Sequence, residues 1–508
     1  MRERLEELLG AAASQITVAT FHAFCLDMLR RFADSAGLPE DFTVVDQTEE
    51  ATLLRSETGM TAREAKETLA SIGEARREMK DASAIAGYAE LTAALAENRA
   101  ISLDSIVPRC VRLLREHGEV REKVEFRWIC IDEYQDIDHA QYELVRTLCP
   151  DGRGLCVIGD PDQAIYSFRG ADMKHFLRFS QDYADAKVAR LTRNYRSSPA
   201  IVDAAGQVVQ GARTSMSVAA RSVSAGGIRI RFHQAATAAA EAEFITHQIE
   251  KLLGGTALFS FDSDRVADET DNRELSFGDI AVLVRLKALL PPLEKALTRL
   301  GLPVQSVSEQ PFVDHPGARE ILQALRASYS TCLAPDMPAR NAIAEFADNA
   351  AVFARLTTAA KTALEQCVEL ARLFPGTLRD FLDHLLLRRG NDLYDEKAER
   401  VALMTLHAAK GLEFPVVFIA ACEDGILPYT KPDEQPDLAE ECRLLYVGMT
   451  RAEQLLYITS ARKRTLFGKT AERIPSPFVK EIEAGLRDEI TTEKRPKRPS
   501  AKQLEFGF

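Results

Sequence analysis

The fold is decided by one stretch, Trp128 to Gly170. It begins WICIDEYQD (128–136), a short apolar run that ends in two adjacent acids, Asp132 and Glu133. After one helical pattern, the device repeats as LCVIGDPDQAIYSFRG (155–170), where an apolar run leads into a polar turn and then aromatic residues. Such runs are typical of buried parallel strands. Because the carboxyl ends of parallel strands face the ligand crevice in open α/β sheets, these turns predict a ligand-binding site at that edge of the sheet.

Each turn has a functional and an ordinary structural interpretation. An acid pair after a strand can hold Mg²⁺ and polarise a water molecule, but it also often caps a helix. The loop with Tyr166, Phe168 and Arg169 can contact phosphate and a base, but these residues also often serve only packing. The two devices in this order make chance a poor explanation.

The stretch resembles motifs II and III of the UvrD/Rep/PcrA group of superfamily 1 DNA helicases. Further segments carry the resemblance along nearly the whole chain: TFHAFC (20–25) after motif Ia, LTRNYRS (191–197) as motif IV, TLHAAKGLEF (405–414) as motif V and EECRLLYVGMTRA (440–452) as motif VI. Two positions depart from the family pattern. Ala408 stands where serine is common, and Cys442 stands at the first arginine position of motif VI.

The resemblance implies an α/β fold with two RecA-like motor domains of the P-loop-NTPase type, each carrying a helical insert. A chain of 508 residues is too long for one core, which agrees with several domains. We expect a first domain at 1–46 and 121–190, its insert at 47–120, a second domain at 191–310 and 400–485, a reduced insert at 311–399, and a flexible basic tail at 486–508.

The resemblance also implies a nucleotide site for ATP and Mg²⁺. Asp132 would hold the metal, Glu133 would orient or deprotonate the attacking water, and Gln163 would sense the γ-phosphate. From the second domain, Arg196 and Arg451 would neutralise the charge that develops during phosphoryl transfer. The remaining nucleotide contacts would come from Tyr195, which stacks on adenine in the family, and from Glu413.

A second implied partner is single-stranded DNA, along which the family moves 3′ to 5′ in repair, replication or recombination. Aromatic side chains suit a motor that ignores sequence, because every base offers a flat face for stacking. The expected DNA contacts are Thr20, Phe21, His22, Tyr166, Phe168, Arg169 and His407.

The P-loop is the family feature that residues 1–508 do not contain. A P-loop supplies backbone N–H groups and a lysine to the phosphates. The one Gly-Lys-Thr, at 468–470, has Lys463 where the motif needs glycine and no strand leading directly into it, so we expect a surface turn there. The first domain is therefore expected to be incomplete at its N-terminus, and this chain alone is expected to have little ATPase activity.

Three explanations remain open for the missing loop. The gene start can lie upstream of Met1, which we favour because the other motifs keep residues that only nucleotide chemistry needs. The motor can be split, with another polypeptide supplying the P-loop. The chain can also be a non-catalytic paralogue that binds single-stranded DNA or regulates a motor. A helicase-nuclease is disfavoured, because the C-terminal part shows no nuclease pattern of acids with a lysine.

Composition is that of an ordinary globular protein, with 46% hydrophobic and 28% charged residues. No run of eighteen apolar residues predicts a membrane span, and the charged N-terminal residues do not form a signal peptide, so we expect a cytoplasmic protein. The net charge of −12 weighs against a nucleic-acid binder. A translocating motor needs only a few local cations, so the motifs are stronger evidence for nucleic-acid binding than the net charge is against it.

The remaining patterns predict local features. Nine cysteines without a C-x-x-C pair indicate reduced, buried thiols, and nine histidines show no metal-ligand spacing. Apolar runs predict strands at 16–19, 228–232 and 280–285. Helical periodicity predicts helices from 47 to 120 with a break at 81–87, and again from 311 to 399.

The C-terminal residues offer a partner site that the motor motifs do not require. Gln503, Leu504, Phe506 and Phe508 resemble the short peptides with which bacterial DNA-processing proteins dock on the sliding clamp. A flexible linker before them would let them reach the clamp. A chance arrangement of six residues is the alternative.

Overall fold

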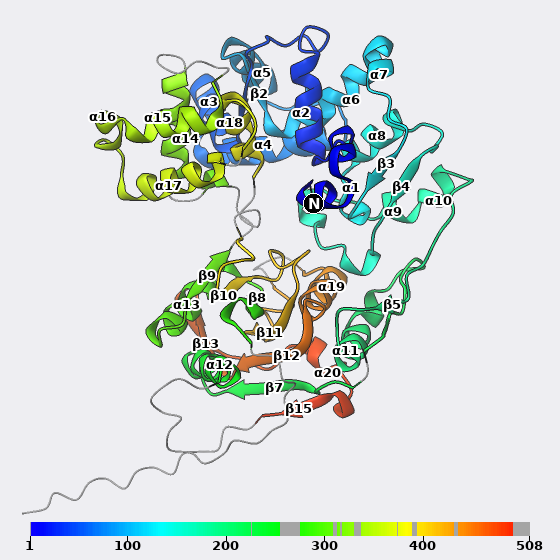
Figure 1. The fold of residues 1–508 in the computed structure, drawn as a ribbon, viewed down its shortest axis with the longest axis vertical. Helices are drawn as coiled ribbons and strands as arrows, with labels where there is room; N and C mark the ends of the chain where they lie inside the picture. The colour runs from blue at the N-terminus through cyan, green and yellow to red at the C-terminus, as the bar shows by residue number, and fades with distance from the viewer. Residues whose placement is uncertain are drawn as a thin grey trace, which may run out of the picture. The chain divides into compact units, whose positions relative to one another are not determined.

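The chain folds into two compact units, shown as a ribbon in Figure 1. The first unit comprises Met1–Arg190, Arg213–Val218 and Val307–Tyr394, and the second comprises Leu191–Ala212, Ala219–Ser306 and Asp395–Phe508. This computed structural model describes residues 2–224, 226–254, 275–307, 312–314, 317–329, 337–372, 374–388, 394–430 and 435–490. The predicted α/β fold class is confirmed, and the predicted clamp-docking residues at 503–508 lie outside these ranges.

The first unit is mainly helical and contains two parallel strand pairs. Its strands are β1 (Thr43–Val45) with β2 (Ala100–Ser102), and β3 (Ile129–Ile131) with β4 (Leu155–Val157). Its helices are α1 (Arg2–Leu9), α2 (Phe21–Arg31), α3 (Gln47–Thr58), α4 (Ala62–Arg77), α5 (Tyr88–Glu97), α6 (Ile106–Glu116), α7 (Gly118–Lys123), α8 (His139–Leu148), α9 (Lys174–Leu177), α10 (Phe179–Asp182), α14 (Ala318–Tyr329), α15 (Ala339–Asp348), α16 (Ala350–Phe353), α17 (Thr358–Arg372) and α18 (Leu378–Leu387).

Local sequence explains where several of these helices begin. Asp46, Thr61 and Asp138 each accept a hydrogen bond from the backbone three residues later and start α3, α4 and α8 with a capping box. The predicted helices between 47 and 120 and their break at 81–87 are confirmed. The strand β2 within that range was not predicted, because three residues are too few to show a period of two.

The strands β3 and β4 carry the two turns that the sequence singled out. Their register pairs Ile131 with Val157 and Cys130 with Cys156. Ile131 is buried, whereas Cys130 and Cys156 lie on the exposed face of the pair. The prediction of buried cysteines is therefore wrong for these two thiols, because strand residues alternate between faces and only one face of this pair packs on a core.

The predicted strand at 16–19 is also wrong. Residues 16–20 run without regular structure into α2, and the described part of the chain places no strand beside them. A short extended run forms a strand only when a neighbour accepts its backbone hydrogen bonds. Thr20 caps α2, where its hydroxyl accepts a hydrogen bond from the Ala23 backbone N–H at 3.3 Å.

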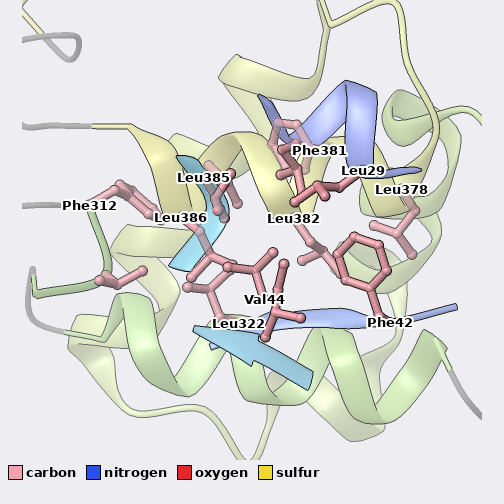
Figure 2. Packing of buried hydrophobic residues seen from close by; sticks show 14 of the residues in the cluster. Leu29, Phe42, Val44, Phe312, Leu322, Leu378, Phe381, Leu382, Leu385 and Leu386 are labelled. Atoms are coloured by element: carbon pink, nitrogen blue, oxygen red, sulfur yellow. The ribbon is translucent and has the colours of Figure 1, made fainter. Parts of the chain in front are cut away.

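The largest core of the first unit joins helices that are far apart in the sequence. Leu29 of α2 and Phe42 before β1 pack in one buried cluster with Leu322 of α14 and Phe381 of α18, as Figure 2 shows. An ion pair between Arg30 Nη2 and Asp383 Oδ2 at 2.7 Å also joins α2 to α18. The predicted helices after 311 are confirmed where the structure describes them, and they pack within the first unit. The predicted domain bounds remain a prediction.

The second unit is built on a seven-stranded sheet, ordered β15-β7-β12-β11-β8-β10-β9. All described pairings from β15 through to β10 are parallel. The strands are β7 (Ile230–Ala235), β8 (Ile280–Val284), β9 (Val304–Val307), β10 (Val401–Thr405), β11 (Phe414–Ala420), β12 (Ala452–Ala461) and β15 (Arg487–Glu489). The strands predicted at 228–232 and 280–285 are thus confirmed, the first with a start two residues later.

Helices cover both faces of this sheet, as parallel strands require. One face packs on α12 (Ala238–Leu252) and α13 (Leu290–Arg299). On the other face lie α11 (Pro199–Val209) and α19 (Leu438–Met449), which contact each other and the sheet. A Cβ added to Gly448 of α19 would lie 2.3 Å from the Leu406 side chain just beyond β10, so a larger residue there would require Leu406 or α19 to shift.

The surface turn predicted at the Gly-Lys-Thr of 468–470 is present, but only Gly468 of the three lies in it. The turn joins the antiparallel strands β13 (Lys463–Leu466) and β14 (Lys469–Glu472), so Lys469 and Thr470 begin β14. Phe467 and Gly468 have φ values of 51° and 75°, which is typical of a two-residue hairpin turn. No helix that the structure describes has both the length and the apolar content to cross a bilayer.

Candidate functional site

The acid turn after β3 exposes Asp132 and Glu133 to solvent. The Glu133 backbone N–H donates to Asp132 Oδ1 at 2.9 Å, and Glu133 has a φ of 52°. This left-handed conformation costs a non-glycine residue about 1–3 kcal/mol and persists only where neighbours impose it. The turn therefore holds two carboxylates at the strand end in a fixed conformation.

A buried glutamine links the acid turn to the second turn. The Gln135 Nε2 donates to Glu133 Oε2 at 2.5 Å, and Gln135 Oε1 accepts from the Asp160 backbone N–H at 3.0 Å. On the second turn, Gln163 Nε2 donates to Asp160 Oδ2 at 2.9 Å. Glu133 and Gln163, predicted to act on the same reaction, thus belong to one hydrogen-bonded network.

Sequence reasoning missed Gln135 as a site residue. The one signal for it in the sequence was its position two residues after Glu133 of the acid pair. Its side chain is 1% exposed, and its partner Asp160 is distant in sequence. Gly159 shows how closely the two turns approach, because a Cβ added there would lie 2.6 Å from Gln135 Oε1. The two turns therefore pack closely at this point, with little room for a side chain at position 159.

The aromatic loop follows Gln163 in the first unit. Phe168 is 63% exposed, and Tyr166 is half-buried with its ring centroid 6.1 Å from that of Phe168. The Arg169 guanidinium carbon lies 5.0 Å from the Tyr166 ring and 5.3 Å from the Phe168 ring. A cation held against two rings makes a surface that can contact both a base and a phosphate.

A second segment of the first unit holds Asp162, which precedes Gln163 and the aromatic loop. Asp162 is 1% exposed, and Ser217 Oγ donates to its Oδ1 at 2.5 Å. Arg213 Nε lies 3.7 Å from Asp162 Oδ2. Ser217 and Arg213 were not predicted as part of the site, because they lie outside the recognised motifs. Their contacts fix the residue that directly precedes Gln163.

The segment at 20–22 is partly committed to structure. Thr20 caps α2, and Phe21 is half-buried against the cluster that contains Ile131 and Tyr134 of the acid turn. His22 is half-buried as well. The structure thus brings this segment to the acid turn, and its predicted contact with DNA remains a prediction.

In the second unit, residues from three motifs meet. Arg196 Nε donates to Glu413 Oε2 at 2.6 Å, and Arg196 Nη1 donates to the Thr450 carbonyl at 3.4 Å. Tyr195 beside them is 72% exposed. Arg196 and Glu413 were both predicted as nucleotide contacts, and their ion pair places them together. The ring of Tyr195 is open to a ligand.

Two predicted residues of the second unit are buried. Arg451 is 2% exposed, and its guanidinium donates to the carbonyls of Val447 at 3.0 Å and Leu412 at 3.1 Å. His407, in the turn after β10, is 9% exposed. Arg451 thus ties the motif V turn to α19. Direct contacts of Arg451 with nucleotide and of His407 with DNA remain predictions.

Two family models match the chain over most of its length. Residues 1–184 match the UvrD/REP helicase N-terminal domain. Residues 189–331 and 342–463 match the UvrD-like helicase C-terminal domain. The chain belongs to the UvrD/REP helicase family.

Relatives of this helicase family align with nearly the whole chain. ATP-dependent DNA helicase PcrA of Bacillus subtilis is 29% identical over 99% of this chain and 80% of its own length. PcrA of Staphylococcus epidermidis is 28% identical over 100% of this chain and 81% of its own length. A solved C-terminal domain of a possible DNA helicase from Lactobacillus covers 58% of this chain and 98% of its own at 14% identity, and its TM-score of 0.26 adds nothing to the assignment.

The acid turn fits the Mg²⁺ that the family resemblance implies. Among the residues that the structure describes, no group of three or more histidine, cysteine or acidic side chains could hold a metal alone. Mg²⁺, however, is usually held by one or two carboxylates together with substrate phosphates and water. The exposed Asp132, whose Oδ1 accepts the Glu133 backbone N–H, suits that role.

Proposed function

We propose that this chain is part of a PcrA-like, ATP-dependent DNA helicase or translocase that moves 3′ to 5′ along single-stranded DNA in repair or recombination. The observation that carries the proposal is the network around Gln135. It connects Glu133, which would act on the attacking water, to the loop that contains Gln163 and Phe168. A change at the nucleotide therefore has a direct route to the DNA-contacting loop.

In this proposal the chain's own residues position the attacking water and neutralise the charge that develops on the phosphoryl group. Bound ATP supplies the phosphoryl group. Gln135 aims the Glu133 carboxylate, which would orient the water and accept its proton, as general bases do in phosphoryl transfer. Arg196, held by Glu413, would neutralise the charge that develops, and such arginines typically contribute about 10³–10⁵ in rate.

DNA binding in this proposal rests on stacking more than on charge. The net charge of −12 offers little long-range attraction to phosphate. The exposed Phe168 ring with Arg169 beside it can instead contact one base and a neighbouring phosphate without reading sequence. Cytoplasmic location and docking on a sliding clamp remain predictions.

We expect that a polypeptide of residues 1–508 shows no DNA-stimulated ATP hydrolysis. The polypeptide contains Asp132, Glu133 and Arg196 but no P-loop to hold the phosphates, so nucleotide would be poorly bound. Phosphate release should be measured with and without oligo-dT, with Glu133→Gln as the control for a contaminating ATPase.

The result separates the open explanations. Hydrolysis that oligo-dT stimulates and that Glu133→Gln removes would contradict the expectation. If hydrolysis appears only when a P-loop is supplied, from upstream codons or from a second polypeptide, the motor interpretation stands. If such a supply gives no hydrolysis while the chain still binds single-stranded DNA, the non-catalytic or regulatory paralogue replaces it.

A further inference from the structure

A cavity in the first unit lies among residues that none of the helicase motifs includes. Its volume is about 670 Å³, and it is enclosed by the segment before β1, the end of α4, α5 and α6. Cavities that bind small molecules in proteins typically measure about 300–1,000 Å³. The space is therefore large enough for a ligand of nucleotide size.

The lining has more basic than acidic side chains, although Arg76, Arg99 and Lys80 are each paired with a carboxylate. Asp81 is the one acidic residue in the lining, and it already accepts hydrogen bonds from Ser83. The basic residues of the lining are Arg76, Lys80, Arg99, Arg109 and Arg112. This excess of positive charge favours an anionic ligand.

Two of these arginines have no internal counter-charge. Arg76 is paired with Glu50 at 2.9 Å, whereas no carboxylate in the described ranges forms an ion pair with Arg109 or Arg112. The Nε of Arg109 is buried and has no hydrogen-bond partner there. A partly buried guanidinium without a carboxylate partner is costly, so Arg109 and Arg112 together are suited to an anion that comes from outside the protein.

The electrostatics of Arg109 agree with that geometry. Burial lowers its pKa, and the neighbouring guanidinium groups of Arg112 and Arg76 lower it further. An anion that binds between these like charges would relieve their repulsion. Arginine suits phosphate in particular, because its planar fork donates two parallel hydrogen bonds to phosphate oxygens.

The backbone of the cavity wall is strained at two positions. Met79 and Arg99 have φ values of 53° and 49°, directly after α4 and α5. Glycine usually occupies this left-handed position at a helix end because other residues are strained there. Both residues line the cavity. Strain of this kind persists where the surrounding structure imposes it, often at binding sites.

The rest of the lining is mainly apolar and includes two aromatic rings, those of Phe42 and Tyr88. Pro39, Tyr88 and Leu95 are among these residues. Such side chains can contact the flat face of a base or the carbon atoms of a sugar, and Tyr88 is half-buried at the cavity.

We propose that this cavity binds a nucleoside polyphosphate, with Arg109 and Arg112 on its phosphates and the apolar lining on its nucleoside. The site is separate from the motor motifs, and the proposal does not depend on ATP hydrolysis or on a P-loop.

The test is a titration of residues 1–508 with fluorescent N-methylanthraniloyl-GTP in the absence of Mg²⁺. Arg109→Gln and Arg112→Gln should each weaken binding about tenfold or more, as expected for the loss of a charge-assisted hydrogen bond. Arg121→Gln is the matched control, because Arg121 on α7 is exposed and lies outside the lining. Arg196→Ala controls for binding at the motor site.

Binding that is unchanged in Arg121→Gln and Arg196→Ala and weakened in both cavity variants would support the proposal. Equal affinity in all variants, or loss only in Arg196→Ala, would overturn it. N-methylanthraniloyl-guanosine, which has no phosphate, should bind at least tenfold more weakly, and equal binding would overturn phosphate recognition. If a DNA strand displaces the fluorescent nucleotide and unlabelled GTP does not, the proposal that the cavity binds a small nucleotide is overturned. Circular dichroism spectra that match the wild type establish that each variant is folded.

Discussion

An Arg464→Ala variant is expected to lose about 3–5 kcal/mol of unfolding free energy in the second unit, because the change leaves buried carboxylates without their cation. Arg464 is 6% exposed and donates from Nη2 to Glu423 Oε1 at 2.6 Å. It also forms an ion pair with Glu241, and both glutamates are at most 1% exposed. Breaking a buried charge network by removing one partner costs far more than the intact network contributes.

This network matters to the site because of the strands that it joins. Glu241 Oε1 accepts from the Ala421 backbone N–H at 2.9 Å, and Glu423 Oε1 accepts from the Ala461 backbone N–H at 2.7 Å. These contacts fix the carboxyl ends of β11 and β12. The residues that precede the two strands are Glu413 and Arg451. Loss of the network should therefore loosen the sheet that positions both.

The measurement is urea unfolding followed by circular dichroism. Arg462→Ala is the matched control, because Arg462 lies two residues away, is exposed and contacts Gln234 at the surface. It should change the unfolding free energy by no more than about 0.5 kcal/mol. Equal effects of the two substitutions would show that the buried network does not stabilise the second unit.

A Phe381→Ala variant is expected to lose about 3–5 kcal/mol of unfolding free energy in the first unit, because it leaves a cavity in a close-packed core. Phe381 is 0% exposed, and its ring centroid lies 5.3 Å from that of Phe374. The same core contains Leu29 of α2 and Leu322 of α14. The loss of stability should therefore extend beyond the helices from α14 to α18 and include α2.

Hydrogen exchange of α2 distinguishes a shared core from a separate one. Phe381→Ala should lower protection in α2, whereas Phe353→Ala, which removes a 40% exposed phenylalanine from α16, should leave α2 unchanged. Unaltered protection of α2 in Phe381→Ala would mean that the helices from α14 to α18 fold independently of the rest of the unit.

The sequence predicted what short patterns can encode. The runs at 129–131 and 155–157 became parallel strands, and the acid pair and the aromatic loop followed them as expected. The helices after 311 showed an apolar face, but a face does not reveal its partner, so their packing on α2 could not be predicted. The sequence also did not show that only one face of the β3–β4 strand pair is buried, so Cys130 was wrongly predicted to be buried.

The site residues follow the same division. Asp132 and Phe168 could be predicted because their motifs are local. Gln135 was missed because its role depends on Asp160, which only the fold brings within 3.0 Å. Arg451 was predicted to face a nucleotide, and its burial among the carbonyls of Val447 and Leu412 depends on how α19 packs against the motif V turn. Long-range partners decide the orientation of side chains that sequence can only locate.

In the proposed function, the loop joined to the acid turn by Gln135 holds single-stranded DNA by stacking. The most direct test is fluorescence anisotropy of labelled oligo-dT titrated with residues 1–508 and with Phe168→Ala. Phe168 is exposed and has no core to support, so the variant should fold normally. The variant should lose about 1–3 kcal/mol in binding free energy, as for other stacking platforms. Unchanged affinity in Phe168→Ala would contradict stacking by this loop.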